Sequence, residues 1–402
     1  MNRPVRRLAA LALAFLAAPL YAQSAPTTIR AGTLIDGRGG VQRNVVVTVQ
    51  DGRIQRIEPG RTGAVTYDFS GMTVLPGMID THVHQDGHFG RSGTTNTPDE
   101  TPAERLLYAA ENAYASLMAG FTTVQSLASG SDVELRRALE RGTFPGPRFL
   151  TSVSSYTNET ATPDQMRAYI ADVLEQNPDV IKFFASKSIR VGGAQTISDE
   201  TIRAGCQAAR AAGKRSVVHS HSPTAARAAS EGGCTTVVHG SQLKAEDFAV
   251  LARNGTFFEP NIGLVSQSYL ENDVKHGFDA EALRYTRDGI PLKLAMFKTA
   301  LTVPGLKIIM GTDAGAGMHG QNAREVIYRV NVGGQKAMDA ITGVTSLNAA
   351  SLGMQDRIGA VAVGMEADLI AVVGDPAQDI TALQRVGFVM RGGTVYKNVT
   401  AP

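Results

Sequence analysis

The amino-acid sequence predicts an α/β protein in which a (β/α)8 TIM barrel is joined to a small β-sandwich domain built from both chain ends. Two observations support this fold class. The middle of the chain, residues 74–355, alternates apolar strand-like runs with helical segments, and eight such pairs in about 280 residues match a closed barrel. The two ends, residues 23–73 and 356–402, instead contain short alternating runs interrupted by turn residues. We therefore expect the two ends to form one domain together.

The N-terminal part of the predicted β domain begins at Ile29 and continues to about Thr73. Its apolar and polar residues alternate, and Asp51-Gly52 separates the runs VVVTVQ and RIQRIE, as expected for a β-hairpin. After about residue 358 the same pattern returns in RIGAVAVG, ADLIAVVG and FVMRGGTVYK. These C-terminal runs are predicted to complete the domain.

The predicted barrel strands are apolar runs without clean alternation, which is typical of strands covered on both faces in a parallel sheet. A segment with helical periodicity follows each of them. The predicted strands are residues 73–84, 121–128, 147–154, 180–186, 215–222, 235–241, 256–262 and 306–315. The helices that follow them are residues 101–119, 131–141, 163–175, 198–212, 223–231, 244–253, 280–300 and 322–338.

The first residues have the layout of a secretory signal peptide. Arg3, Arg6 and Arg7 precede an apolar run over residues 8–20, and small residues follow it. We expect a signal peptide at residues 1–22, cleaved after Ala22, and an exported mature protein that is periplasmic or secreted. The apolar run is shorter than the roughly 20 residues of a comfortable bilayer span, and no second long apolar segment follows. No membrane span is therefore expected in the mature chain.

Export would allow disulfide bonds to persist, but the chain has only two cysteines, Cys206 and Cys234. Cys206 falls in a predicted helix and Cys234 just before a predicted strand. We therefore expect both to be small buried apolar residues, and a disulfide between them is the less favoured alternative.

Composition and motif content exclude several classes of protein. The hydrophobic fraction of 43% is that of a globular chain and not of a disordered one. With 39 basic against 37 acidic residues, the formal charge of +2 gives no electrostatic reason to expect a nucleic-acid partner. A P-loop, a GxSxG nucleophile elbow and an HExxH helix are absent from the sequence.

Several polar residues fall at the carboxyl ends of the predicted strands, where the active sites of barrel enzymes are built. His82 and His84 are two positions apart, so their side chains lie on the same face of the first strand. Lys182 interrupts the apolar run VIKFF of the fourth strand, where an unpaired lysine is costly to bury. Three later strands end in His219, His239 and Asp313.

Four histidines and one carboxylate at a single rim favour a metal site, because neutral imidazoles and carboxylates are common ligands of Zn²⁺ and its neighbours. Lys182 cannot be a ligand as an ammonium group. Burial lowers the pKa of a lysine, and the neutral amine can take up CO₂ to form a carbamate, an anionic ligand able to bridge two metals. The alternative is a buried lysine paired to Asp313 or Glu259.

The ordered set of motifs resembles the amidohydrolase superfamily, and within it an exported dinuclear zinc branch that includes prolidase-like carboxypeptidases and ochratoxin-degrading amidohydrolases. The resemblance covers nearly the whole mature chain. An HxH pair alone is a weak motif, whereas the full ordered set together with the terminal β domain is highly specific. The motifs that carry it are GTLIDGRGG, VLPGMIDTHVH, VIKFF, VVHSHS, VVHG, GTDAG, DRIGAVAVGMEADLIAVVGDP and VMRGGTVYK.

The resemblance implies a site for two divalent metal ions, expected to be Zn²⁺, bridged by a CO₂-derived carbamate on Lys182. The 20-residue step from His219 to His239 matches the family's spacing and selects His219 over His221. His221 is then expected on the other face of the strand or behind the ligands. The implied ligands are His82, His84 and Asp313 for one ion, and His219 and His239 for the other.

The resemblance also implies hydrolysis of an amide or peptide C–N bond by a hydroxide that bridges the metals, with Asp313 as general base and acid. His239 or His319 is expected to assist at the carbonyl oxygen. The candidate substrates are small molecules: a dipeptide, an N-acyl amino acid or an ochratoxin-like aryl amide. Lys187 and Arg190, just after the fourth strand, could meet an anionic substrate group or face solvent. A homo-oligomer is left open.

Two other functions stay open on the sequence. One is a mononuclear zinc deaminase, or an imidazolonepropionase-like cyclic-amide hydrolase, which needs the HxH pair, a histidine and an aspartate but no lysine in the fourth strand. The other is a non-catalytic periplasmic binding protein. His88 and His276 are expected to be structural or solvent-facing. The segment SYTNET after the third strand lacks a Gly-rich form, so details of the substrate loop cannot be carried over.

Overall fold

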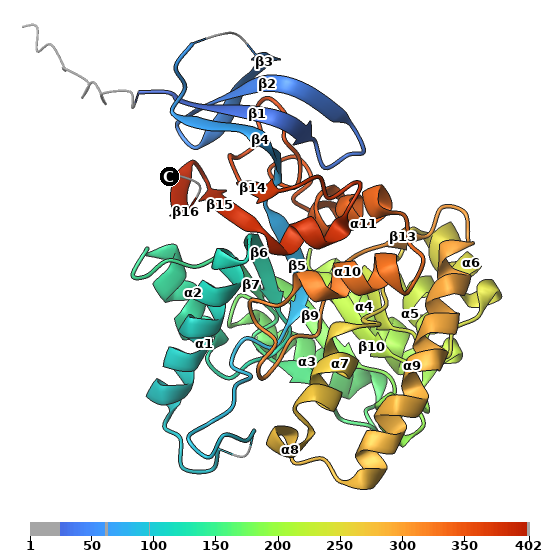
Figure 1. Ribbon diagram of the computed structural model, residues 1–402. Helices are drawn as coiled ribbons and strands as arrows, with labels where there is room; N and C mark the ends of the chain where they lie inside the picture. Colours follow the sequence, from blue (N-terminus) through green and yellow to red (C-terminus); the bar gives the residue numbers. More distant parts are fainter. Residues whose placement is uncertain (1–24, 61–62, 96, 400–402) are drawn as a thin grey trace, which may run out of the picture.

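The computed structural model describes residues 25–60, 63–95 and 97–399. The predicted signal peptide, residues 1–22, lies outside the described residues. Within them, the two chain ends form one β layer at the top of Figure 1, and a ring of parallel strands surrounded by helices fills the rest of the molecule.

The β layer is a seven-stranded sheet to which both chain ends contribute, as the sequence predicts. Strands β2 and β3 pair as the predicted hairpin. Strand β4 joins the two chain ends, because it pairs in parallel with β1 and antiparallel with β14. Apolar residues of both ends, such as Phe69 and Phe388, share one core. The strands are β1 (Thr27–Ile35), β2 (Val41–Gln50), β3 (Arg53–Pro59), β4 (Tyr67–Pro76), β14 (Leu369–Val373), β15 (Val386–Arg391) and β16 (Thr394–Asn398).

The inner strands are parallel throughout, and they form two hydrogen-bonded groups, β5-β6-β7 and β8 to β13. Backbone hydrogen bonds join the last strand segment to the first: the N–H of Asp313 donates to the carbonyl of His82 over 2.7 Å, and the N–H of His84 to Ala314 over 2.8 Å. The strands are β5 (Met78–Val83), β6 (Phe121–Ser126), β7 (Arg148–Thr151), β8 (Ser155–Tyr156), β9 (Val180–Phe184), β10 (Arg215–Ser220), β11 (Thr236–His239), β12 (Phe257–Glu259) and β13 (Lys307–Ile308).

Helices cover the outside of the strand ring (Figure 1). Those predicted after the first six strands are present as α1 to α6. The seventh connection is more elaborate than expected, because α7 and α8 precede the long helix α9. The predicted helix 322–338 is two helices, separated where Gly334 takes a φ of +82°. The helices are α1 (Pro102–Met118), α2 (Asp132–Glu140), α3 (Pro163–Leu174), α4 (Asp199–Ala211), α5 (Pro223–Glu231), α6 (Ala245–Asn254), α7 (Leu264–Glu271), α8 (Asp273–His276), α9 (Ala280–Leu301), α10 (Ala323–Asn331), α11 (Ala337–Val344) and α12 (Ser346–Ser351), with short 3-10 turns η1 (Ile189–Val191) and η2 (Ile380–Gln384).

The two cysteines are joined by a disulfide, so the expectation of two separate apolar residues was wrong. Cys206 is on α4 and Cys234 lies between α5 and β11, with their Cα atoms 4.7 Å apart. Both residues are buried, as expected. Their separate positions in the sequence do not show that α4 packs against the turn after α5, and this packing is what brings the two sulfurs together.

Candidate metal centre

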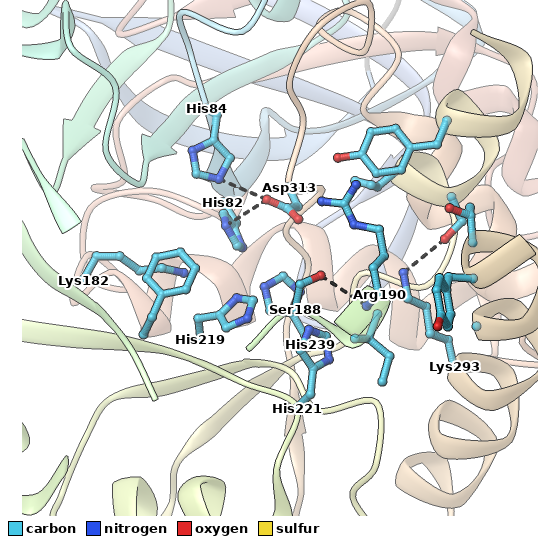
Figure 2. Close-up of a pocket in the computed structure, with 18 residues that line it drawn as sticks. His82, His84, Lys182, Ser188, Arg190, His219, His221, His239, Lys293 and Asp313 are labelled. Carbon is cyan, nitrogen blue, oxygen red and sulfur yellow. Dashed lines mark hydrogen bonds and ion pairs between the residues drawn. The ribbon is translucent and has the colours of Figure 1, made fainter. Parts of the chain in front are cut away.

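The predicted ligands converge at the carboxyl ends of the barrel strands, as shown in Figure 2. His82 lies on β5 and His84 directly follows it, while Lys182 lies on β9 and His219 on β10. Buried strands fix these positions, because residues two apart share a face and parallel strands bring their ends to one rim. The remaining two, His239 at the end of β11 and Asp313 in the segment after β13, complete the set.

The first ligand group consists of His82, His84 and Asp313, whose potential ligand atoms all lie within 4.8 Å of one another. The Nε2 of His82 is 3.2 Å and that of His84 is 3.1 Å from Oδ1 of Asp313. Burial opposes ionisation of Asp313, but the two neighbouring histidines hold the pKa of its carboxyl below the usual value. Two imidazoles and a carboxylate at this spacing fit a divalent metal ion.

The second ligand group contains His219, His221 and His239, again with ligand atoms within 4.8 Å of one another. The alternative that His221 lies on the other face of the strand was therefore wrong. His219 and His221 are two apart and share a face, as His82 and His84 do. The Nδ1 of His221 lies 2.9 Å from the hydroxyl oxygen of Ser241, and its ring stacks on that of His239 with centroids 5.0 Å apart. Burial lowers the pKa of His221 to about 3, so the ring is neutral.

Lys182 lies in the same cavity, where its amine is 5.3 Å from the ring centroid of Phe184 and has neither a hydrogen-bond nor an ion-pair partner. Its side chain is 1% exposed, and Nζ makes no hydrogen bond. Neither Asp313 nor Glu259 forms an ion pair with Lys182 in the described part of the chain. The alternative of a structural lysine paired to one of these carboxylates is therefore not observed. Burial lowers its pKa to about 8, which makes the neutral amine accessible near neutral pH. An orphaned buried amine among histidines fits a lysine that is modified or that binds a further group.

Two of these residues have strained backbones. His239 has a φ of +73° and Asp313 a φ of +59°, in the left-handed region that non-glycine residues rarely occupy. The backbone at Asp313 is held by the hydrogen bond from its N–H to the carbonyl of His82. Next to His239, the N–H of Gly240 donates to the carbonyl of Ser220. Such strain concentrates at functional sites and persists because the surrounding structure enforces it.

Buried carboxylates support the ligands from behind, and sequence reasoning did not assign them this role. The carboxylate of Glu259, at the end of β12, lies 3.0 Å from Nδ1 of His82. Asp80 accepts hydrogen bonds from the N–H of His82 at 3.1 Å and from the backbone and side chain of Thr312, next to Asp313. The amide of Asn322 donates to the same carboxylate. A carboxylate inside the apolar strand FFE was the available signal for Glu259.

The cavity over these ligands has a volume of about 220 Å³, and a second cavity of about 420 Å³ adjoins it. His84, Tyr269 and Asp313 line both. Beyond the ligands, the smaller cavity is lined by residues that sequence reasoning missed on α7 and α9, because nothing in the sequence shows which face of these helices turns inward. They include Ser266, Tyr269, Tyr285 and Lys293.

The other predicted residues are placed as follows. His319 lies behind the first ligand group, with Nε2 3.1 Å from the carbonyl oxygen of His84, and it does not line the smaller cavity. Arg190 lines that cavity, whereas Lys187 is outside it and pairs with Glu159 at 3.5 Å. His88 pairs with a glutamate and stacks on a tyrosine, His276 packs among aromatic rings, and both also line the second cavity.

A barrel of parallel strands with two His-rich groups at its carboxyl rim is typical of metal-dependent barrel enzymes. The sequence comparison agrees, because residues 73–396 match the model of the amidohydrolase family. The chain belongs to this family and is a hydrolase of C–N bonds. Enzymes of this family generally use divalent metals. Membership in an enzyme family argues against the non-catalytic binding protein.

Named relatives and solved structures show the same resemblance, three of them along most of the chain and one over a shorter segment. Imidazolonepropionase from Stenotrophomonas maltophilia is 24% identical over 88% of this chain and 91% of that protein. Dihydroorotase from Streptococcus pneumoniae is 35% identical over 117 residues, which is 25% of its own length. The structure of a Xaa-Pro dipeptidase with bound methionine superimposes with a TM-score of 0.85 at 26% identity, covering 93% of this chain and all of the other. Aspergillus niger ochratoxinase has a TM-score of 0.79 at 21% identity, covering 93% and 96%, which shows the shared fold.

The described part of the chain contains no helix that is long and apolar enough to cross a membrane.

Proposed function

We propose that this protein hydrolyses an amide or peptide C–N bond of a small molecule with two divalent metal ions, Zn²⁺ being the expected metal. The observation that carries this proposal is Lys182, a buried amine without a hydrogen bond or ion pair in the cavity that holds both ligand groups. His82, His84 and Asp313 would hold one ion. His219 and His239 would hold the other, with the carboxylated Lys182 between the two groups.

The modification of Lys182 balances without a further reactant beyond CO₂. A bond forms between the neutral Nζ and the carbon of CO₂, and one proton leaves the nitrogen. The resulting carbamate carries the negative charge that a buried ammonium cannot supply. The depressed pKa of Lys182, about 8, provides the neutral amine that this reaction needs.

The bound ions would supply an acidified water molecule and polarise the substrate carbonyl. Asp313 has the position and protonation state of the general base, because its carboxylate reaches both cavities and its pKa is held low by the adjacent histidines. It would accept the proton of the attacking water and pass it to the leaving amine nitrogen as the C–N bond breaks. The products are then a carboxylic acid and an amine.

The neutral histidines near the carbonyl have different parts in this proposal. His239 lies in the second ligand group, from which it can assist at the carbonyl oxygen. His221 lines the cavity beside it and adds a residue that can contact the substrate. His319 supports the backbone at His84 from behind, which favours positioning of the ligand over direct contact with the substrate.

The substrate classes that fit this proposal are dipeptides, N-acyl amino acids and ochratoxin-like aryl amides. The similarity to a Xaa-Pro dipeptidase with methionine in its active site favours the first two. The similarity to ochratoxinase is one of fold only. The N-terminal pattern of residues 1–22 supports export, so we propose that the enzyme works outside the cytoplasm.

The test is reconstitution of the purified, chelator-treated chain with Zn²⁺ and bicarbonate. We expect two zinc ions per chain by elemental analysis, hydrolysis of members of a dipeptide and N-acyl amino acid panel, and a carbamate signal in NMR with ¹³C-bicarbonate. Lys182→Ala should lose the signal and most of the activity, whereas Lys187→Ala, on the exposed loop nearby, should retain both. One zinc ion per chain at full activity would favour the mononuclear deaminase or imidazolonepropionase-like alternative.

A further inference from the structure

Arg190 enters the smaller cavity without a carboxylate partner. Its guanidinium lies 5.4 Å from the ring centroids of both Tyr269 and Phe278, and no ion pair or side-chain hydrogen bond to it is present in the described part of the chain. The turn η1 carries it, and Ser188 begins this turn by accepting a hydrogen bond from the Arg190 N–H. In Figure 2 the guanidinium extends from this turn toward Asp313. The two aromatic rings therefore hold a cation in place beside the candidate metal centre.

Lys293 brings a second cation to the same cavity from α9. Its Nζ donates a hydrogen bond to the hydroxyl of Ser266 over 3.0 Å, and the side chain is partly buried. Within the described residues no carboxylate forms an ion pair with it. The strongest attraction on Lys293 comes from Glu325, whose carboxylate is occupied by the N–H groups of residues 262–264 and by Arg329.

Arg190 and Lys293 bring two positive charges to the lining of one cavity. Burial lowers the pKa of Lys293, and the positive charge of Arg190 lowers it further. The nearest negative group within the cavity, Asp313, is a predicted metal ligand. Lys187, three residues before Arg190, shows the contrast, because it is exposed and already paired with Glu159. A bound anion would relieve the repulsion between Arg190 and Lys293 and form charge-assisted hydrogen bonds with both.

We infer that Arg190 and Lys293 form an anion subsite, and that the part of the substrate held in the smaller cavity is a compact group ending in a carboxylate. This inference rests on the proposed function, because it names the substrate class of the same site. The planar guanidinium suits a carboxylate, and the ammonium adds a second donor. A volume of about 220 Å³ is below the ~300–1,000 Å³ typical of ligand pockets. It therefore accommodates one residue-sized half of the substrate.

The other half of the substrate has its own space. The second cavity, about 420 Å³, meets the first at His84, Tyr269 and Asp313. The scissile bond is then placed at Asp313, between a small anionic side and a roomier side. Neutral amides of similar size would leave both cations without an anion, so they should bind less tightly.

The test measures binding of compounds that cannot be hydrolysed to the full-length, zinc-loaded protein by calorimetry. Each pair differs only in the carboxylate: L-leucine and L-leucinol, L-phenylalanine and L-phenylalaninol, L-proline and L-prolinol. We expect at least one acid to bind tenfold or more tightly than its alcohol. Arg190→Gln and Lys293→Gln should each remove about tenfold of that acid's affinity and leave the alcohol unchanged, while Lys187→Gln should alter neither.

Equal binding of acid and alcohol in every pair, or binding of none of them, would overturn the inference. Loss of affinity in both members of a pair would show a merely structural effect of the substitution, and thermal unfolding of each variant checks that its fold is intact. These outcomes are independent of turnover. Discrimination between acid and alcohol without any hydrolysis contradicts the proposed function alone, whereas hydrolysis without discrimination contradicts the anion subsite alone.

Discussion

His82 and Glu259 form a buried pair in which Nδ1 lies 3.0 Å from a carboxylate oxygen and both side chains are only 1% exposed. The pairing directs Nε2 of the same ring toward Asp313, 3.2 Å away. A histidine whose second nitrogen donates to a carboxylate is fixed in one tautomer and is a stronger metal ligand. Glu259 thus connects β12 to the predicted metal ligand His82 on β5.

Substitution of Glu259 should weaken metal binding in a graded way. Glu259→Gln keeps an acceptor for His82 but removes the charge, and Glu259→Ala removes both, so zinc affinity should fall about tenfold and then about a hundredfold. Competition with a chelating dye measures this. The matched control is Glu325→Gln, a buried glutamate that touches no predicted ligand, and it should leave zinc affinity unchanged. Equal zinc affinity in all four proteins would exclude the proposed support.

Asp313→Asn should abolish proton transfer while preserving the fold. An amide cannot accept the proton of the attacking water, and removal of a general base typically lowers kcat by about 10²–10⁴. We expect a loss of about a thousandfold in kcat, with a thermal unfolding midpoint close to that of the wild type. The zinc content must be measured beside the rate to separate lost catalysis from lost metal. Near-normal turnover of the zinc-loaded variant would rule out Asp313 as the base.

The stability of the protein should depend on pH through Asp132, which is fully buried at the start of α2, between β6 and β7 in the sequence. Its carboxylate accepts from the hydroxyl of Thr151 at 2.6 Å, but its other oxygen has no partner, and burial raises its pKa to about 7. Because the folded pKa exceeds the unfolded value of 3.8, the folded protein holds a proton that the unfolded chain releases between about pH 4 and 7. Stability from this group is therefore present at low pH and lost as pH rises.

The comparison that isolates this effect is Asp132→Asn, whose side chain does not titrate. Urea unfolding between pH 4 and 7 should show the wild type losing stability relative to the variant by at most about 1.4 kcal/mol per pH unit. A constant difference between the two proteins across this range would mean that Asp132 has an ordinary pKa.

The disulfide between Cys206 and Cys234 closes a loop with a sequence separation of 28 residues. A loop of this length restricts the unfolded chain enough to stabilise the protein by about 3.6 kcal/mol. The Cys206→Ser, Cys234→Ser double variant should lose about this much unfolding free energy and become insensitive to a reductant that destabilises the wild type. If reductant leaves the unfolding of the wild type unchanged, the bond contributes no stability.

The sequence could predict the alternation of barrel strands and helices because buried strands leave a local pattern of apolar residues. The convergence of the candidate ligands could also be predicted, because His82, His84, Lys182 and Asp313 each stand out as a polar residue in or just after an apolar strand. The carboxyl ends of such strands share one rim for geometric reasons. For these residues, the local sequence pattern was therefore enough to predict that their side chains meet at one rim of the barrel.

Contacts between distant segments could not be predicted in the same way. The disulfide depends on how α4 packs against the turn after α5. The helix α7 has no local side-chain cap; instead Glu325, about 60 residues away, accepts the N–H groups at its start. Tyr269 and Lys293 enter the cavity because of this packing, and their sequence surroundings carry no sign of it. The position of His221 could have been predicted, because residues two apart in a strand share a face and His221 follows His219 by two positions.

The order of strands in the seven-stranded sheet also determines when β4 can gain both of its neighbours. In it, β4 lies between β1 and β14, and the hydroxyl of Thr73 donates to the carbonyl of Gly374, 301 positions later. During synthesis, the chain must keep this edge of β4 open until the residues of β14 have been made. Because β4 leads directly into β5 and His82, the first predicted metal ligand is anchored on its outer side only after β14 has been made. A truncation near the C-terminus should therefore impair assembly of the metal site far from the cut.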